Sequence, residues 1–141
     1  MSTLERAISI AAEAHAGQAD KAGERYILHP LRVMLALSTD EERIVGVLHD
    51  VVEDCAGWSF ERLRAEGFSE PVVGGIAAVT RNPDEDYVTF VRRAAQHPIG
   101  RRVKLADLRD NSNLARIANP SAADRQRLDR YLRAIDMLEQ K

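Results

Sequence analysis

Apolar residues recur at helical spacing along almost the whole of this 141-residue chain, and this pattern most limits the folds open to it. Near the N-terminus, Leu4, Ala7, Ile8 and Ala11 lie three or four positions apart, which places their side chains on one face of a helix. The sequence contains no alternating stretch of useful length for a strand. It therefore predicts an all-α fold, an irregular helical bundle of about seven to nine helices in a single domain over residues 1–141.

Capping residues and helix breakers divide this pattern into segments. Thr3, Thr39 and Ser121 each precede a helical stretch as N-cap residues do, and Gly17 is expected to stop the first helix. The pattern predicts helices over about residues 3–15, 30–35, 40–54, 59–63, 70–79, 86–96, 98–114 and 122–138, with polar loops over 17–28 and 80–86.

Composition excludes several classes of protein. With 45% hydrophobic and 30% charged residues, the chain is expected to fold as a globular protein. A net charge of −2 without a Lys/Arg block argues against a double-stranded nucleic acid partner. No stretch approaches the roughly 18 apolar residues that span a membrane. The single cysteine, Cys55, excludes an internal disulfide and fits a reducing compartment, so we expect a cytoplasmic enzyme or binding module.

One short run combines charged and aliphatic residues, and its charged side chains would need a compensating partner if they were buried. His49-Asp50-Val51-Val52-Glu53-Asp54 continues an aliphatic helical segment. In a continuous helix, His49 stacks on Glu53 and Asp50 on Asp54, so that all these side chains point to one side. Buried charges without a partner cost several kcal/mol. The spacing therefore indicates a cleft that holds a divalent metal and the water that the metal activates.

Two further features could complete such a site. His29 precedes Pro30 at the end of the long loop, and Asp107 shares a helix face with Asn111. The donor set of His29, His49, Asp50 and Asp107 would suit Mn(II) or Fe(II), and Zn(II) or Co(II) less selectively. Each residue alone also has a structural explanation, such as a solvated helix end or a turn cap.

Together, these residues resemble a known family. The resemblance covers about residues 3–135 and is to the hydrolase domain of the RelA/SpoT family, which belongs to the HD-domain superfamily of metal-dependent phosphohydrolases. Within this family, the chain resembles the stand-alone small alarmone hydrolases, which include the metazoan SpoT homologues. The ordered motifs that carry the resemblance are His15-x-Gly17-Gln18, Lys21-x-Gly23, Tyr26-x-x-His29-Pro30, His49-Asp50-x-x-Glu53-Asp54 and Lys104-Leu105-Ala106-Asp107-x-x-x-Asn111.

The resemblance implies a divalent metal, expected to be Mn(II), and a small nucleotide as the substrate. It implies removal of the 3′-diphosphate of ppGpp as the reaction, which leaves GDP and pyrophosphate. It also implies roles for individual residues. The family's metal ligands match His29, His49, Asp50 and Asp107, its catalytic acidic pair matches Glu53 and Asp54, and its substrate contacts match Lys21, Tyr26, Asn111, Arg127 and Tyr131.

Three questions stay open in the sequence. Either Glu53 or Asp54 could act as the base, because two adjacent carboxylates titrate as a coupled pair. Asp20 stands where the family has an Arg that would stack on guanine, and Cys55 stands where it has a Thr. The change at Asp20 favours an alternative, a pyrophosphatase or phosphatase acting on another nucleotide such as NADPH or a deoxynucleotide. A further alternative to a ppGpp hydrolase is a non-catalytic nucleotide-binding module.

Overall fold

The computed structural model describes residues 1–140, and it contains only helices, turns and loops apart from one isolated β-bridge between Ala19 and Arg25. This confirms the predicted all-α fold. The helices of this part of the chain are Leu4–Ala14 (α1), Leu28–Leu35 (α2), Asp40–Leu48 (α3), Val51–Asp54 (α4), Phe60–Ala65 (α5), Glu70–Ala78 (α6), Tyr87–Ala95 (α7), Pro98–Asn111 (α8) and Ala122–Glu139 (α9), with a 3₁₀ turn at Leu114–Arg116 (η1).

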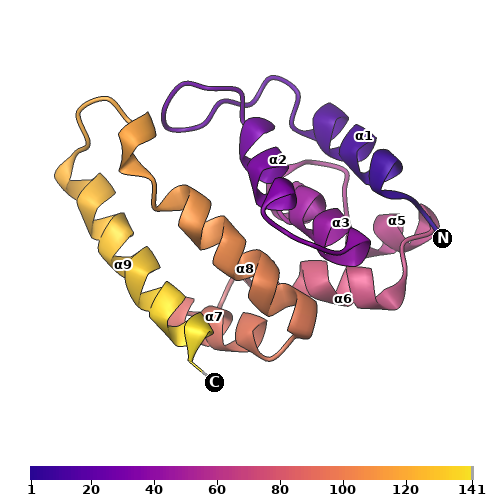
Figure 1. The fold of residues 1–141 in the computed structure, drawn as a ribbon. Coiled ribbons are helices and arrows are strands. Elements are labelled where there is room, and N and C mark those ends of the chain that lie inside the picture. The colour runs from indigo at the N-terminus through magenta and orange to yellow at the C-terminus, as the bar shows by residue number, and fades with distance from the viewer. Residues whose placement is uncertain (141) are drawn as a thin grey trace.

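Helix α8 runs through the middle of the molecule and separates its neighbours into two groups (Figure 1). Helices α2, α3 and α6 pack on one side of α8, with α1 against α3, while α7 and α9 pack on the other. Each group has its own apolar cluster. The larger cluster includes Ile10, Val45 and Ile76, and the smaller one includes Leu108 and Leu138. Burial of side chains of this size contributes about 1.5–3 kcal/mol each, so the two clusters fix α8 from both sides.

Side-chain caps begin most of the longer helices, as the sequence predicts. Thr39 accepts a hydrogen bond from the Glu42 amide, and Glu42 reciprocates, so that α3 begins with a complete capping box. Ser121 and Asp124 form the same arrangement at the start of α9. Ser69 precedes α6 without a side-chain cap, and there the helix begins with Pro71 in its first turn.

The prediction of one continuous helix over residues 40–54 is wrong, because the chain breaks at His49 and Asp50. Helix α3 ends at Leu48, and α4 resumes at Val51 after Asp50 adopts φ −103° and ψ −1°. On a regular helix, adjacent side chains project about 100° apart. The break instead brings His49 Nε2 within 3.1 Å of Asp50 Oδ2. The turn therefore gives both side chains a common direction.

The packing of α2, α3 and α8 brings distant residues together at one place. His29 lies in the first turn of α2, His49 directly follows α3, and Asp107 lies in the C-terminal half of α8. These three helices are in mutual contact. Within residues 1–140, every helix is too short or too polar to cross a lipid bilayer.

Candidate active site

The four predicted metal ligands meet in one cluster. The Nε2 atom of His29 lies 2.9 Å from Asp107 Oδ1 and 3.8 Å from Asp50 Oδ2. The Nε2 atom of His49 lies 3.3 Å from the same Asp107 oxygen and 3.1 Å from the same Asp50 oxygen. Both imidazoles and Asp107 are buried, and Asp50 is largely buried. Nitrogen and oxygen donors from three parts of the chain thus face one small space.

These separations fit a bound cation. Donor atoms that coordinate a metal at about 2.0–2.2 Å lie roughly 3–4 Å from one another across the coordination sphere. Donor atoms of His29, His49 and Asp50 all lie within 4.8 Å of one another, and Asp107 contacts both imidazoles. Imidazole nitrogens and carboxylate oxygens together are donors that Mn(II), Fe(II) and Zn(II) accept. The residues are therefore a possible site for one divalent metal.

Each imidazole keeps its Nε2 atom for the cluster because its other nitrogen is already bonded. His49 directly follows α3 and donates from Nδ1 to the carbonyl oxygen of Gly46 in that helix at 2.6 Å. His29 donates from Nδ1 to Asp110 Oδ2, also at 2.6 Å. Such outer hydrogen bonds fix the ring orientation of a ligating histidine. Asp110 was not among the predicted site residues, and the only signal for it in the sequence is its position three residues after Asp107 on the same helix.

The charges of the cluster favour an added positive charge. Burial disfavours the imidazolium form of His49, but the charges of Asp50 and Asp107 outweigh it and hold the His49 pKa well above its usual value. Burial would lower the pKa of His29 as well, but hydrogen bonds to Asp107 and Asp110 outweigh burial and raise it. Burial alone would raise the pKa of Asp107, but Lys104 and the two imidazoles hold it well below its usual range. A divalent cation would satisfy the carboxylates while leaving the imidazoles neutral.

The acidic pair lies beside this cluster on α4. Glu53 and Asp54 are both exposed, and Glu53 lines a pocket together with Asp50. Loss of hydration raises the pKa of Glu53, and the charges of Asp50 and Asp54 raise it further. The pKa of Asp54 is also raised, first by loss of hydration and then by Asp50. Carboxylates that retain a proton more readily than usual suit proton transfer.

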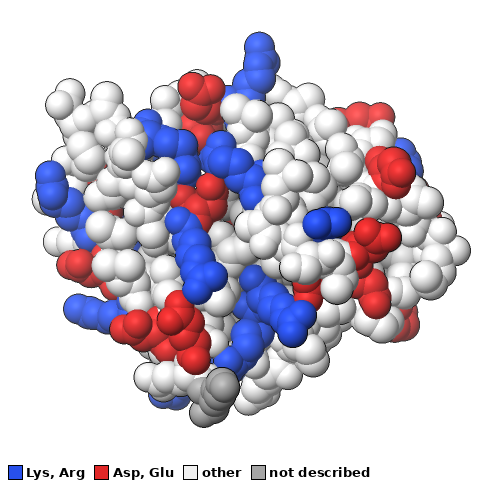
Figure 2. All heavy atoms as spheres, in the orientation of Figure 1, with Lys and Arg blue, Asp and Glu red and all other residues white. Residues whose placement is uncertain are grey.

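A pocket of about 430 Å³ opens from His29 toward the N-terminal part of α9. Basic side chains line it, and the face seen in Figure 2 has basic and acidic groups interspersed between α9 and α2. Partial burial and the charge of Arg127 lower the pKa of Lys21, and both of these cations line the pocket. Leu114 and Ile117 add an apolar surface. The basic lining residues are Lys21, Arg32, Arg116 and Arg127.

A smaller pocket of about 220 Å³ lies on the other side of the cluster, beside Asp50, Glu53 and Asp107. Its basic residues are Arg81, Lys104 and Arg130, none of which is among the predicted substrate residues. Among the described residues, the buried Tyr87 hydroxyl that lines this pocket has no hydrogen-bond partner. Three of the predicted substrate residues, Tyr26, Asn111 and Tyr131, line both pockets. The two pockets therefore adjoin at the cluster.

All five predicted substrate residues lie at these pockets, and two of them also contact the cluster. The Tyr26 hydroxyl donates to Asp50 Oδ2, and burial together with the Asp50 charge raises the pKa of Tyr26. Asn111 Nδ2 donates to Asp107 Oδ1 at 3.1 Å. Lys21 and Arg127 line the larger pocket only, and Arg127 is ion-paired with Asp124.

Asp20, which departs from the family pattern, holds the loop that carries Lys21. Its Oδ1 atom accepts hydrogen bonds from the amides of Ala22 and Glu24 at 2.8 and 3.0 Å, and its own amide donates to the Glu24 carbonyl. Gly23 has φ +82°, a conformation that favours glycine in this turn. Asp20 therefore stabilises a tight loop at the edge of the larger pocket.

Comparison with solved structures finds the same fold in a metazoan SpoT orthologue that hydrolyses ppGpp. The TM-score is 0.80, the match covers 99% of this chain and 86% of that chain, and the sequences are 22% identical. At this identity, the likeness shows a shared fold.

Curated relatives are named as guanosine-3′,5′-bis(diphosphate) 3′-pyrophosphohydrolases or as GTP pyrophosphokinases. The guanosine-3′,5′-bis(diphosphate) 3′-pyrophosphohydrolase of Aquifex aeolicus is 34% identical over 120 residues, and that of Borreliella burgdorferi is 36% identical over 83 residues. A probable GTP pyrophosphokinase of Mycobacterium leprae is 30% identical over 139 residues. These matches cover 77%, 56% and 89% of this chain, respectively. The chain spans only 17%, 12% and 17% of the lengths of these relatives.

The model of one protein family, described as the HD domain, matches residues 7–127, which is most of the chain and includes every residue of the cluster. This chain belongs to the HD domain family.

Proposed function

We propose that this protein is a metal-dependent nucleotide phosphohydrolase that removes the 3′-diphosphate of ppGpp and releases pyrophosphate. The observation that carries the proposal is the convergence of His29, His49, Asp50 and Asp107 between two pockets that basic residues line. The names of the Aquifex and Borreliella relatives support ppGpp as the substrate. Other relatives are named GTP pyrophosphokinases, but a His/Asp cluster beside an acidic pair suits the activation of water.

His29, His49, Asp50 and Asp107 would hold the metal, and we expect Mn(II), which accepts mixed nitrogen and oxygen donors. When bound, the metal supplies Lewis-acid chemistry: it polarises a phosphoryl oxygen and lowers the pKa of a water molecule. Glu53 lines the smaller pocket beside Asp50, so we assign it as the group that orients and deprotonates the attacking water. Asp54, next to it, shares the proton, because two adjacent carboxylates titrate as a coupled pair.

The two pockets suggest how the substrate lies. We place the nucleoside part in the larger pocket, which Lys21 and Arg127 line, with Asn111 beside the sugar. The 3′-diphosphate then reaches the smaller pocket, where Lys104 and Arg130 neutralise its charge. Tyr26 and Tyr131 line the junction of the pockets. The oxygen of water bonds to the first phosphorus, the bond from that phosphorus to the 3′ oxygen breaks, and the 3′ oxygen takes up a proton.

The products formed from ppGpp with Mn(II) test this proposal. We expect GDP and pyrophosphate in equal amounts, and we expect Glu53→Gln to retain the metal while turnover falls by about 10²–10⁴-fold, the range typical of losing a general base. Glu61→Gln is the matched control, because Glu61 is exposed and lines neither pocket. Release of orthophosphate in place of pyrophosphate, or wild-type turnover by Glu53→Gln, would contradict the proposal.

A second candidate is a pyrophosphatase or phosphatase that acts on another nucleotide at the same centre. The observation that favours it is Asp20, which lines the larger pocket at the position where the family has a cation. A panel of ppGpp, NADPH and deoxynucleotides, assayed for both phosphate products, separates the two candidates. Absence of turnover with every nucleotide, despite bound metal, would instead favour a non-catalytic nucleotide-binding module.

Three broader predictions belong to this proposal. We treat residues 1–141 as one HD-type domain that acts on a small nucleotide and has no membrane or double-stranded nucleic acid partner. We also place it in the cytoplasm, where the single Cys55 would stay reduced.

A further inference from the structure

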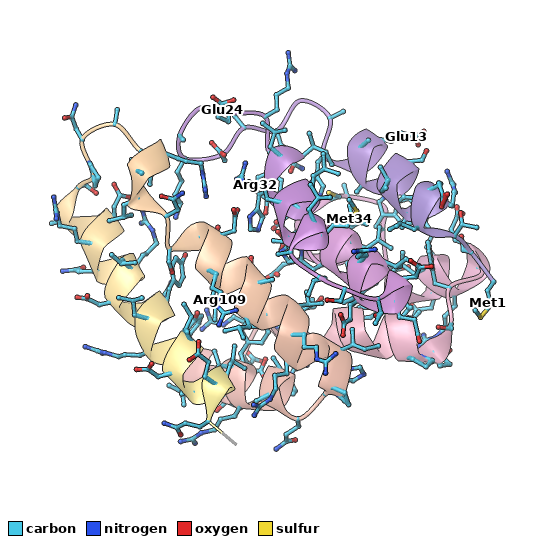
Figure 3. The ribbon with its side chains drawn as sticks, in the orientation of Figure 1. Met1, Glu13, Glu24, Arg32, Met34 and Arg109 are labelled. Carbon is cyan, nitrogen blue, oxygen red and sulfur yellow. The ribbon has the colours of Figure 1, made fainter. Side chains whose placement is uncertain are left out.

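The carboxylate of Asp110 joins the metal-ligand cluster to the wall of the larger pocket. Its Oδ2 atom accepts the hydrogen bond from His29 Nδ1 at 2.6 Å. Arg32 donates from Nε to Oδ1 at 2.8 Å and from Nη2 to Oδ2 at 3.1 Å, a two-point contact. Arg32 lies on the side of α2 that faces α8 (Figure 3). Both Arg32 and His29 line the larger pocket.

A second arginine reaches Asp110 from η1. Arg116 donates to the Asp110 carbonyl oxygen at 2.6 Å, and its guanidinium lies 3.5 Å from Asp110 Oδ2. The Asp110 side chain is only 11% exposed, so these partners take up most of its surroundings. Helix α2 therefore meets α8 and the η1 turn that follows α8 at this carboxylate.

We infer that Asp110 is the positioning residue of the metal site: it holds His29 in the tautomer whose Nε2 atom is free for the metal, and Arg32 and Arg116 hold Asp110. This inference rests on the metal site proposed above. An ionised carboxylate can only accept hydrogen bonds, so His29 Nδ1 must carry the proton. The Nε2 atom then keeps its lone pair and faces Asp107 and Asp50. Outer partners of this kind change metal affinity by about 10- to 100-fold.

Asp110→Asn separates this role from a general loss of packing. The amide has the size of the carboxylate but has one oxygen and one NH₂ group. If the NH₂ group faces His29, it donates to Nδ1 and moves the ring proton to Nε2, which blocks the metal position. If it faces Arg32 instead, two donors oppose each other. Either arrangement weakens the metal site while the helix keeps its shape.

Calorimetric titration of Mn(II) and Zn(II) into the metal-free protein tests the inference without any substrate. We expect Asp110→Asn to bind about 10- to 100-fold more weakly than the wild type. Glu139→Gln is the matched control, because Glu139 pairs with the exposed Arg109 at 2.8 Å and lines neither of the two pockets. It should bind the metal within twofold of the wild type. Wild-type affinity in Asp110→Asn would overturn the inference.

Nuclear magnetic resonance of the Zn(II)-loaded wild type gives a second measurement, which can be made even if the Asp110→Asn variant does not fold. The proton on His29 Nδ1 should be observable and protected from solvent, and it should be lost or shifted in Arg32→Gln, which frees one side of Asp110. A proton on Nε2 of His29, or an unchanged Nδ1 proton and affinity in Arg32→Gln, would overturn the inference. Failure of the wild type to hydrolyse ppGpp would overturn only the proposed reaction, since neither measurement includes a nucleotide.

Discussion

At the scale of single residues, Asp50 is the side chain whose removal should expose the role of the cluster. Its Oδ2 atom faces both imidazoles and accepts the Tyr26 hydroxyl. Asp50→Asn removes a negative charge that the cation requires, so we expect metal content and hydrolysis to be lost together. Metal analysis after dialysis, paired with turnover, measures both. Asp129→Asn, an exposed change on α9, should alter neither. A metal-loaded but inactive Asp50→Asn protein would contradict the assignment of Asp50 as a ligand.

Residue types and spacing were sufficient to predict which four residues lie together in the cluster, but not which residues surround them. Burial of an ionisable side chain is costly without a counter-charge, so such residues in apolar segments can be recognised from the sequence. The four residues of the cluster are His29, His49, Asp50 and Asp107. Asp110 is different, because its significance depends on a contact with His29 across 81 positions of the chain. The same applies to the basic residues of the smaller pocket, which look like ordinary helix or loop residues in the sequence.

At the scale of elements, the start of α3 depends on its capping box. Thr39→Ala removes the oxygen that accepts the Glu42 amide, so we expect the free energy of unfolding to fall by about 1 kcal/mol. Thr39→Ser keeps a hydroxyl in the same place and should retain most of the stability. Urea unfolding measures both. Equal losses in the two variants would show that the methyl group, and not the cap, is what stabilises this turn.

The loop between α6 and α7 should respond to acid through Glu85. Arg93 donates to Glu85 and to the carbonyl oxygens of Ala77 and Thr80, and its hydrogen bonds to Glu85 hold the pKa of that carboxyl at about 2. The usual pKa is 4.5, so folding favours the ionised form. The stabilisation is therefore fully present above about pH 4.5 and is lost as the pH falls toward about 2.

Glu85→Gln should be less stable than the wild type at neutral pH, and the difference should shrink across this pH window. Unfolding curves recorded between pH 7 and pH 2.5 measure it. Glu70→Gln, which breaks the exposed pair with Arg64, is the control and should have little effect at any pH. A difference between Glu85→Gln and the wild type that stays constant with pH would contradict the role of the Arg93 contact.

Helix boundaries show where local sequence stops being informative. The starts of α3, α7 and α9 follow from residues that cap the helix locally, at Thr39, Asp86 and Ser121. The break at His49 and Asp50 contains neither glycine nor proline, so the sequence carries no helix-breaking residue there. It depends on where α2 and α8 bring their side chains, which is a property of the folded chain.

At the scale of the whole molecule, α9 is attached through the smaller apolar cluster. It packs against α7 and α8 and contributes Leu138 and Ala134 to that cluster, while Arg101 donates to the Leu138 carbonyl oxygen at 2.5 Å. Leu138→Ala should lower the free energy of unfolding by about 2–5 kcal/mol, because it opens a cavity. Leu138→Met conserves volume and should cost less than about 1.5 kcal/mol. Thermal unfolding measures both, and a neutral Leu138→Ala would contradict the docking of α9 on this cluster.

The packing of α9 against α7 and α8 also shapes the candidate active site, because α9 carries part of the wall of the larger pocket. Arg127 and Tyr131 on α9 line the larger pocket, whereas the possible metal ligands lie on α2, α8 and the turn after α3. The all-α class could be predicted from periodicity, but the central position of α8 between two clusters could not, because it depends on which apolar faces meet.

Anomalous X-ray scattering at the manganese absorption edge, from crystals grown with Mn(II), is the most direct measurement of the central claim. One peak should lie within coordination distance of His29, His49, Asp50 and Asp107 together. A peak elsewhere, or one from which the His29 and Asp107 side chains are turned away, would contradict the account.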